Sequence, residues 1–488
     1  MAEGTGPTTP RQPARRKTPG AVPIPAPEFG AHETQIHRKK ASLPALGHIA
    51  RAERPREERG EIGERKERPL TMNEPYELHC RQCGRRLGNA PVAMCDECIA
   101  PLEVTFDLES LRGRLTRERI AARPGNLWRY RELLPIPADA QTELPVGFTP
   151  LMEARQLGRR LGLDRLYVKN DAVCAPSLSF KDRVVAVALA RARAFGLHVV
   201  GCASTGNLAN AVAAQAARGG FAAWVFVPSS IEPTKLIASA VYGARVVPIN
   251  GNYDQVNRLC SLVADEFHWG LVNVNLRPYY AEGSKTVGFE IAEQLGWRLP
   301  DNVVVPMAGG ALISRIRKGF EELVATGLVE QKPVKFFGAQ ATGCSPISTA
   351  VKQGLKFPEP QKPHTICHSL AIGNPADGYL AIETMRETGG WAEDASDEEI
   401  IAGMELLAQS EGIFAETAGG VVVGAAKKLI EQGRIRADET TVLAITGNGL
   451  KTTEALAGRT LLLPAVEPKL AAFKALLGEI GAPMTAGS

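Results

Sequence analysis

A lysine stands between Phe180 and Asp182 in the stretch SLSFKDR, which runs from Ser177 to Arg183. The run that follows, VVAVALARARAFG, is rich in alanine and valine and predicts a helix, so Lys181 lies at or near a helix start. That end of a helix carries unpaired N–H groups and the positive pole of the dipole, so a lysine gains nothing there electrostatically. The stretch alone leaves two interpretations: an ordinary solvated lysine, or an amine placed for chemistry, which must be unprotonated to act as a nucleophile.

Four cysteines form a second candidate for chemistry. They make two CxxC pairs separated by a segment of hairpin length: Cys80, Cys83, Cys95 and Cys98. Four thiolates at this spacing are typical of a tetrahedral zinc ribbon, and the closed coordination shell of such a site is usually structural. The alternative is a set of unpaired buried cysteines. We expect a zinc ion that folds residues of about 76–104 and takes no part in catalysis.

Two loops of small residues have the composition of anion-binding turns. The stretch CASTGNLANA places, between a predicted strand and a predicted helix, Ser204, Thr205, Gly206 and Asn207. The stretch VVVPMAGGALIS leads from an apolar strand into Ala308, Gly309, Gly310, Ala311 and Leu312. Hydroxyls and backbone N–H groups before a helix suit a carboxylate or a phosphate. Taken alone, the first loop is also an ordinary strand–helix turn, and the second also suits close packing of a helix on a strand.

Two further stretches carry polar groups next to predicted strands or helices. LAITGNGLKT ends a strand at Thr446, whose hydroxyl can hydrogen-bond a heteroatom without placing a charge there. NLRPYYAEGSKT gathers Arg277, Ser284 and Lys285 before the predicted helix VGFEIAEQL. For these three residues, a solvated loop is the alternative to a binding site.

The elements that must position these residues alternate between strand and helix. β-rich runs such as RLYVKN, VVGCAS, AAWVFVP, ARVVPI, GLVNVN, NVVVPMA, VKFFGAQ and TVLAIT are separated by alanine-rich stretches. This alternation predicts an α/β fold with parallel sheets that are covered on both faces. Many of the runs end in Gly, Ser, Thr or Asn, at the strand ends where open α/β sheets bind ligands.

Composition and charge indicate folded domains with a basic tail and argue against nucleic-acid binding. The chain has 488 residues, 44% of them hydrophobic and 23% charged, which is sufficient for two or three folded domains. Residues 1–71 hold 14 Lys and Arg against 9 Asp and Glu, a charge of +5, so the remainder carries −1 of the total of +4. The nearly neutral remainder argues against a nucleic-acid partner. The 1–71 segment has too little apolar surface to offset its ordering entropy, and we expect it to be a disordered basic tail.

Neither a membrane span nor a secretion signal is expected. We find no apolar run of about 18 residues, and the N-terminus lacks an apolar signal core. The cysteines number nine, an odd number, with four in close pairs. That pattern favours a metal site in a reducing compartment over a disulfide framework, so we expect a cytoplasmic protein.

The motifs together resemble the pyridoxal-phosphate enzymes of fold type II, which include tryptophan synthase β, serine and threonine dehydratases, cysteine synthase and threonine synthase. SFKDR, STGN, the small-residue loop and TGNG follow the order of that group over about residues 76–460. NLRPYYAEGSKT, ITGNGLKT and the cysteine ribbon in front look most like threonine synthase. The resemblance implies two three-layer parallel-sheet domains. We therefore expect the disordered tail at 1–71, a four-cysteine zinc ribbon at 72–106, a catalytic body of two interleaved α/β domains at 107–460, and a C-terminal helix and tail at 461–488.

The resemblance also implies a role for each motif. Lys181 would form the internal aldimine with pyridoxal phosphate and then act as the mobile base. Asn207 would hydrogen-bond the ring hydroxyl of the cofactor, and Thr446 would face its pyridine nitrogen. The backbone amides that would hold the cofactor phosphate are those of Ala308, Gly309, Gly310, Ala311 and Leu312. The substrate carboxylate would be received by Ser204, Thr205 and Gly206. Arg277 would bind the substrate phosphate, because arginine matches phosphate oxygens in a bidentate way, and Ser284 and Lys285 would assist.

The implied reaction converts O-phospho-L-homoserine and water into L-threonine and phosphate, a lyase reaction of threonine biosynthesis. Many threonine synthases carry an asparagine- and glycine-rich phosphate loop where this chain has MAGGAL, so only backbone donors are expected from that loop. The alternatives on the same scaffold are cysteate synthase, which uses phosphoserine, and threonine/serine dehydratase, whose substrate has no phosphate. The group also implies a homodimer.

Overall fold

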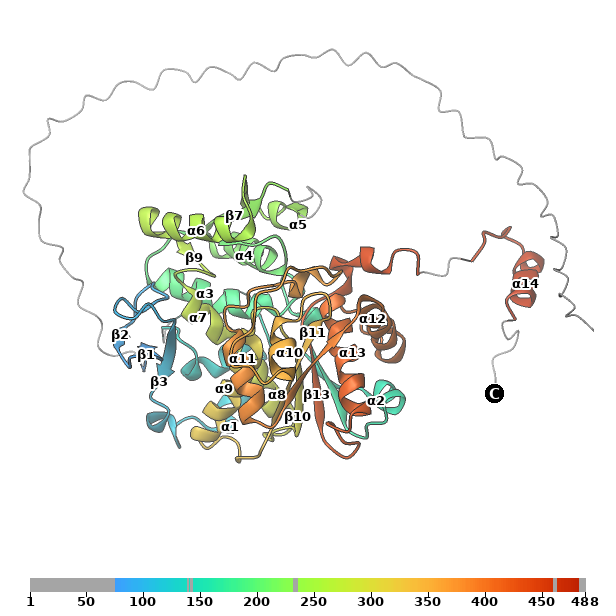
Figure 1. Ribbon diagram of the computed structural model, residues 1–488, viewed down its shortest axis with the longest axis horizontal. Coiled ribbons are helices and arrows are strands. Elements are labelled where there is room, and N and C mark those ends of the chain that lie inside the picture. The colour runs from blue at the N-terminus through green and yellow to red at the C-terminus, as the bar shows by residue number, and fades with distance from the viewer. Residues whose placement is uncertain (1–74, 138–139, 141–143, 231–235, 460–462, 482–488) are drawn as a thin grey trace, which may run out of the picture. The chain divides into compact units, whose positions relative to one another are not determined.

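The computed structural model describes most of the chain (Figure 1): residues 75–137, 140, 144–230, 236–459 and 463–481. The chain divides into two units, 1–67 and 68–488, and the elements below belong to the second. The tail expected at 1–71 lies outside the described residues.

The larger sheet has six strands in the order β12-β11-β10-β13-β5-β4, and β4 alone runs antiparallel to its neighbour. Its strands are β4 (Leu151–Glu153), β5 (Leu166–Asn170), β10 (Asn302–Pro306), β11 (Lys335–Ala341), β12 (Trp391–Ala395) and β13 (Thr441–Ile445). Successive side chains of a strand point to opposite faces. Accordingly Val303 and Val305 lie in one hydrophobic core, while Val304 lies in another.

Helices cover both faces of this sheet, as Figure 1 shows for α8–α11 and for α12 and α13. The first core includes side chains of α8 (Thr286–Gln294), α9 (Ala311–Ala325), α10 (Pro346–Lys352) and α11 (Gly378–Glu387). The second includes side chains of α2 (Arg155–Leu161), α12 (Asp397–Glu411) and α13 (Thr417–Glu431). A capping box starts α12: Ser396 Oγ accepts from the Glu399 N–H, and the Glu399 carboxylate accepts from the Ser396 N–H.

The smaller sheet has four parallel strands in the order β8-β7-β6-β9. They are β6 (Val199–Ala203), β7 (Ala222–Pro228), β8 (Arg245–Ile249) and β9 (Gly270–Leu271). Val225 packs with α3 (Lys181–Ala194), α4 (Asn207–Gly219) and α7 (Arg277–Gly283), whereas Phe226 packs with α6 (Tyr253–Phe267) on the other face. The short helix α5 (Ile237–Ala240) follows β7.

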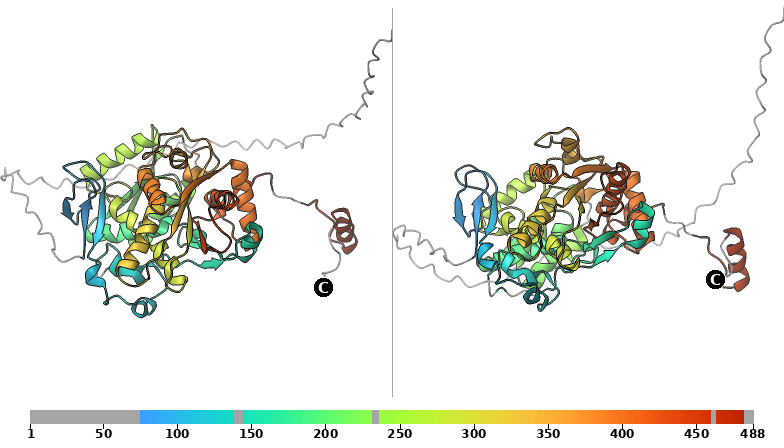
Figure 2. Two further views of the ribbon diagram at one scale, coloured as in Figure 1. Left: turned by 60° about the horizontal axis from the view of Figure 1, so that its bottom comes forward. Right: turned by 90° about the horizontal axis from the view of Figure 1, so that it is seen from below.

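A three-stranded antiparallel sheet holds the cysteine pairs and is drawn in blue in Figure 2. Its strands are β1 (Tyr76–Cys80), β2 (Arg86–Gly88) and β3 (Leu102–Phe106). Tyr76, Leu78 and Val104 are buried in the same core as side chains of α3 and α4. The ribbon therefore shares a core with the smaller sheet and has no separate one.

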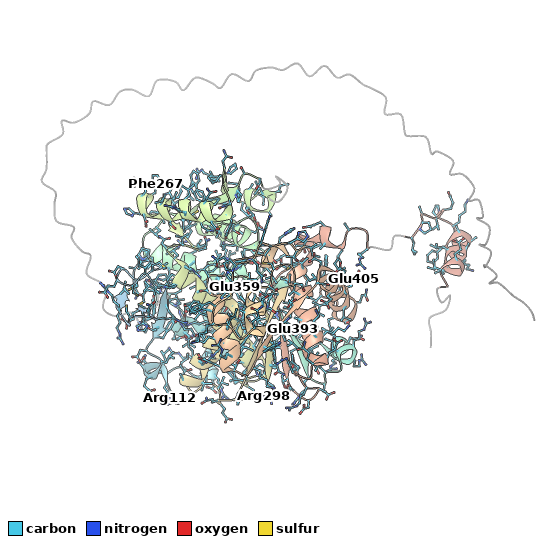
Figure 3. The ribbon with its side chains drawn as sticks, in the orientation of Figure 1. Arg112, Phe267, Arg298, Glu359, Glu393 and Glu405 are labelled. Carbon is cyan, nitrogen blue, oxygen red and sulfur yellow. The ribbon has the colours of Figure 1, made fainter. Side chains whose placement is uncertain are left out.

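The remaining elements are short and connect or follow the sheets. They are α1 (Arg117–Ala121), α14 (Leu470–Glu479) and the 3-10 helices η1 (Glu109–Leu111), η2 (Leu127–Leu133), η3 (Asp171–Val173), η5 (His368–Leu370), η6 (Gly449–Lys451) and η7 (Thr453–Leu456). Figure 3 labels four exposed side chains of the body, Arg112, Phe267, Arg298 and Glu359. Within the described ranges, every helix is too short or too polar to cross a membrane.

The fold class expected from the sequence is confirmed, since two parallel sheets are each covered on both faces. The antiparallel edge strand β4 was not expected. Among the described strands it pairs with β5 alone, and the two antiparallel strands are joined through α2. The proposed boundaries between the ribbon, the body and the C-terminal segment stay predictions.

Candidate active site

Adjacent parallel strands bring three predicted motifs to one edge of the larger sheet. β13 lies between β10 and β5, so the loop 308–312, Thr446 and the segment from β5 to Lys181 leave the sheet at the same end. The Phe180 N–H donates to the Thr446 carbonyl at 2.9 Å, and Ser179 bridges to Gly447. Thr446 is thereby held beside the turn that carries Lys181.

Lys181 is the first residue of α3, so the predicted helix start is confirmed. Its amine donates to the phenolic oxygen of Tyr280 at 3.0 Å. The ring centroid of Phe180 lies 4.6 Å from the same amine. The nucleophile candidate is therefore half-buried between two aromatic side chains, with one phenol as a polar contact.

Asn207, predicted to contact the cofactor, begins α4 and is held between two opposite charges. Its amide nitrogen donates to both carboxylate oxygens of Glu416, at 3.1 and 2.9 Å. Its amide oxygen accepts from the Lys451 amine at 2.9 Å. Burial raises the pKa of Glu416 and lowers the pKa of Lys451. These partners fix which end of the Asn207 amide donates and which accepts.

The two small-residue loops leave room for a ligand next to their backbone. A Cβ added at Gly206 or at Gly309 would meet no atom within 4 Å. Gly310 has a φ of 93°, and a Cβ there would lie 2.7 Å from the Asp377 carbonyl oxygen, so this turn requires glycine. The fully buried Ser179 hydroxyl has no hydrogen-bond partner among the described residues. Open turns and an unpaired hydroxyl beside Lys181 fit a bound cofactor that carries a phosphate.

Arg277 is tied to the second of these loops. Its guanidinium donates to the Asp377 carboxylate at 2.7 Å. The Asp377 N–H in turn donates to the Gly309 carbonyl at 2.9 Å. The candidate for the substrate phosphate therefore lies next to the loop predicted to hold the cofactor phosphate, and its side chain is one-third exposed.

The structure does not support the assisting role predicted for Ser284 and Lys285. Both side chains are buried. The Lys285 amine forms ion pairs with Glu282 at 2.7 Å and Glu322 at 2.8 Å. A fully buried ammonium needs such partners to offset its desolvation. Lys285 therefore stabilises the packing of α8 on α9 and presents no surface to a substrate.

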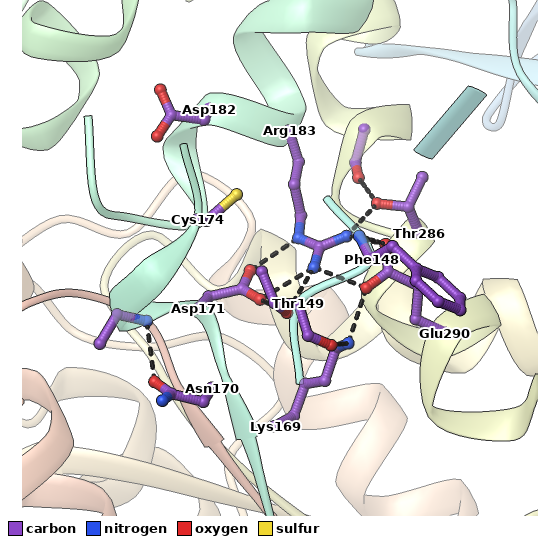
Figure 4. A network of polar contacts seen from close by, with 12 residues as sticks. Phe148, Thr149, Lys169, Asn170, Asp171, Cys174, Asp182, Arg183, Thr286 and Glu290 are labelled. Atoms are coloured by element: carbon purple, nitrogen blue, oxygen red, sulfur yellow. Dashed lines mark hydrogen bonds and ion pairs between the residues drawn. The ribbon is translucent and has the colours of Figure 1, made fainter. Parts of the chain in front are cut away.

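A second network of buried charges surrounds Arg183, two residues after Lys181 in the chain (Figure 4). The Arg183 guanidinium donates to both carboxylate oxygens of Asp171, at 2.7 and 2.8 Å, and also to Glu290. The Lys169 amine donates to Glu290 at 2.6 Å. Burial alone would raise the pKa of Glu290, but Arg183 and Lys169 outweigh burial and lower the pKa to about 2. Two cations and two carboxylates from four elements thus fix the start of α3.

The four predicted metal ligands come together at one end of the ribbon. Their sulfur atoms all lie within 4.8 Å of one another. The Cys80 and Cys98 sulfurs are 3.4 Å apart, and the Cys83 and Cys95 sulfurs are 3.6 Å apart. Tetrahedral zinc with bonds of about 2.3 Å places its sulfur ligands roughly 3.8 Å apart. The donor set and its spacing therefore fit a zinc ion.

Several residues of the site were not assigned from the sequence. Tyr280 and Lys451 stand inside stretches that were singled out, but nothing in those stretches shows which side chains they contact. Glu416 directly precedes a helix that starts with ordinary small residues, so the sequence gives no sign of its role. Its position in the site follows from the close approach of Gly447. A Cβ on Gly447 would lie 2.3 Å from a Glu416 oxygen. Asp377 carries no sequence signal of its own.

Comparison with known proteins identifies the family of this chain. The family described as "Pyridoxal-phosphate dependent enzyme" matches residues 142–447. The chain belongs to this family. The cofactor class expected from the sequence is thereby confirmed.

Curated relatives carry the name threonine synthase, and they confirm the expected resemblance and the lyase class. The protein of Methanocaldococcus jannaschii is 38% identical over 379 residues, which cover 77% of this chain and 93% of the relative. That of Methanosarcina acetivorans is 36% identical over 379 residues, with 77% and 92% covered. That of Halalkalibacterium halodurans is 35% identical over 349 residues, with 70% and 94% covered.

Solved structures share the fold of this chain. Threonine deaminase isoform 2 from Solanum lycopersicum has a TM-score of 0.53 and 22% identity, covering 69% of this chain and 96% of its own. Diaminopropionate ammonia lyase from Escherichia coli has a TM-score of 0.55 and 17% identity, covering 79% and 96%. At these identities the likeness supports the fold of the family and says nothing about the substrate.

Proposed function

We propose that this protein converts O-phospho-L-homoserine and water into L-threonine and phosphate. The observation that carries the proposal is the meeting of Lys181, the open loop at Gly309 and the Asp377-bound Arg277 at the ends of adjacent elements. A reaction on a phosphorylated substrate requires a base, a loop that binds the cofactor phosphate, and a cation that binds the substrate phosphate. The threonine synthases that are 35–38% identical over most of this chain support the same reaction.

Each group has a distinct task in this proposal. When bound, pyridoxal phosphate supplies an electron sink for negative charge that develops on substrate carbon. Asn207 would donate to the ring hydroxyl of the cofactor in exchange for one of its two contacts with Glu416, because Lys451 occupies its amide oxygen. Thr446 would offer a neutral hydroxyl to the pyridine nitrogen. The backbone N–H groups of the loop 308–312, at the start of α9, would hold the cofactor phosphate.

The substrate would be held at its two anionic ends. Ser204, Thr205 and Gly206 precede α4, where the carboxylate can accept N–H and hydroxyl hydrogen bonds. Arg277 would exchange part of its contact with Asp377 for the substrate phosphate. The Lys181 amine then takes the α proton and a β proton. The bond between Cγ and oxygen breaks, phosphate leaves, Cγ gains a proton, water adds its hydroxyl at Cβ, and a proton returns to Cα.

The four cysteines would hold zinc as a structural ion. Four thiolates close the coordination shell, so no position is left for water or substrate. We also propose that the enzyme works in the cytoplasm, that it forms a homodimer, and that residues 308–312 contribute only backbone donors to the cofactor phosphate.

The test is an assay of the purified holoenzyme with O-phospho-L-homoserine and O-phospho-L-serine side by side. We expect phosphate and threonine to form in equal amounts from the first substrate and little phosphate from the second. Preferential release from phosphoserine would favour the cysteate synthase alternative. Ammonia release from unphosphorylated serine or threonine, without phosphate chemistry, would favour a dehydratase.

A further inference from the structure

The amine of Lys181 has one side-chain hydrogen-bond partner among the described residues, and that partner is Tyr280. The distance from the amine to the phenolic oxygen is 3.0 Å. Otherwise the amine faces aromatic surface, with ring centroids of Phe180 and Tyr280 at 4.6 and 5.7 Å. Two charged groups of the same site, Glu416 and Lys451, are already bound to Asn207. The phenol is therefore the polar group that the amine can use.

We propose that Tyr280 is a further catalytic residue, whose phenolic oxygen holds the Lys181 amine while that amine takes protons from the substrate. This inference rests on the proposed function for its substrate, but the contact itself concerns only this chain. A phenol both donates and accepts hydrogen bonds. It can donate to the lone pair of a neutral amine and accept from an ammonium without moving.

The path of the proton shows where the phenol acts. A proton leaves substrate carbon and forms an N–H bond on the Lys181 amine, which becomes an ammonium. The faces of the two rings attract this cation, but its partial removal from water still costs free energy. A hydrogen bond from the ammonium to the Tyr280 oxygen lowers this cost. The proton later returns to substrate carbon, and Tyr280 keeps its own proton throughout.

The phenol is held in place by the packing of α7 on α3. A Cβ on Gly283 would lie 2.5 Å from the Arg183 carbonyl oxygen and the Val184 Cα, so α7 lies directly against α3. Contacts that fix a catalytic group before the reaction save the cost of ordering it. The neighbouring Tyr279 hydroxyl has different partners, since it donates to the Ala90 carbonyl at 2.9 Å and accepts from the Ala90 N–H at 3.1 Å.

The experiment compares Tyr280→Phe with Tyr279→Phe. Each removes one oxygen from adjacent positions of the same helix and keeps the ring. For Tyr280→Phe we expect kcat to fall roughly 10- to 100-fold, as for the loss of a hydrogen bond to a charged group. KM should stay within about threefold, and the isotope effect with α-deuterated substrate should rise because proton transfer becomes slower. Tyr279→Phe should keep kcat within about threefold and lose thermal stability.

A second readout does not depend on turnover. Pyridoxal phosphate is added to each apoprotein, and the change in visible absorbance reports its attachment to Lys181. Tyr280→Phe should slow attachment roughly tenfold, while Tyr279→Phe should not. If the wild type turned over no phosphohomoserine but Tyr280→Phe still slowed attachment, the proposed function would fail and the role of Tyr280 would stand. Wild-type kcat, isotope effect and attachment rate in Tyr280→Phe would overturn the inference.

Discussion

In the proposed reaction, the choice of a phosphorylated substrate depends on Arg277. The Arg277→Ala variant should raise the KM for O-phospho-L-homoserine roughly 10- to 100-fold, because the substrate phosphate loses a charge-assisted hydrogen bond. The affinity for pyridoxal phosphate should change little, since in the proposed arrangement backbone groups hold that phosphate. Steady-state kinetics and a cofactor titration measure the two effects, with exposed Arg298→Ala as the control. Lost cofactor affinity at an unchanged KM would assign Arg277 to the other phosphate.

Asp182 gives a pH-dependent prediction for stability. Burial raises the pKa of Asp182 to about 6, although Ser177 donates to it from both N and Oγ. The carboxyl titrates near 4 in an unfolded chain. The folded state therefore binds this proton more tightly, and the stabilisation it gives at low pH is lost as pH rises from about 4 to about 6.

An uncharged side chain removes this dependence. Between pH 4 and pH 8, the unfolding free energy of Asp182→Asn should gain roughly 2–3 kcal/mol relative to the wild type, since one pKa unit is worth about 1.4 kcal/mol. Denaturant titrations of both holoenzymes at the two pH values measure the difference. A constant difference across this range would mean that Asp182 ionises equally in the folded and unfolded states.

For single residues, the sequence predicts local backbone structure better than it predicts side-chain contacts. The start of α3 at Lys181 follows from the helix-forming run behind it, and the turn at Gly310 follows from local glycine chemistry. The partners of Asn207 do not follow, because Glu416 and Lys451 are far from it in the chain and meet it only through packing. The substrate-binding role predicted for Lys285 is not supported for the same reason. A lysine in a polar stretch gives no sign that it is buried and paired with two carboxylates.

The ribbon packs against the rest of the body and is not an independent module. Its strands share a core with α3 and α4, and Glu103 of β3 forms ion pairs with Arg315 and Lys318 of α9. Loss of zinc should therefore destabilise more than the ribbon itself. It should not remove a catalytic group, because the residues around Lys181 come from α7, α13 and the β13 loop.

The Cys95→Ser variant tests both statements. It should lose its zinc, and its thermal midpoint should fall by several degrees, since roughly 2–4 °C corresponds to 1 kcal/mol in a domain of moderate size. Well below that midpoint, kcat should stay within about threefold of the wild type. Metal analysis, thermal melts and kinetics measure the three quantities, and Cys260→Ser, at a buried cysteine outside the ribbon, is the control. A loss of rate by orders of magnitude in a folded protein would contradict a structural role.

Most strands could be predicted as elements because their runs are apolar and end in turn residues. β12 was missed, since WAEDA contains two carboxylates and lies at the edge of the sheet, where one side of the strand has no neighbour. β4 was missed because three residues give no readable period. In the run GLVNVN only Gly270–Leu271 pairs as a strand, because the Asn275 side chain binds the Leu271 N–H and the Trp269 carbonyl and turns the chain.

Across the whole molecule, two sheets with different strand orders supply one site. The larger sheet supplies the loop 308–312 and Thr446, and the smaller one supplies Ser204 to Asn207 through β6. The sequence predicts that strand ends bind a ligand, but it does not predict strand order. The order places β13 between β10 and β5, and α3 follows β5. This topology brings Lys181, at the start of α3, close to the loops that follow β10 and β13.

The most direct test of this account is to identify the lysine that carries the cofactor. The holoenzyme is reduced with borohydride, which fixes the bond between the cofactor and its lysine, and is then digested and analysed by mass spectrometry. The account predicts that the modified peptide contains Lys181, and that Lys181→Ala yields a folded protein with neither the modification nor threonine formation. Modification of another lysine, or wild-type turnover in Lys181→Ala, would contradict the central claim.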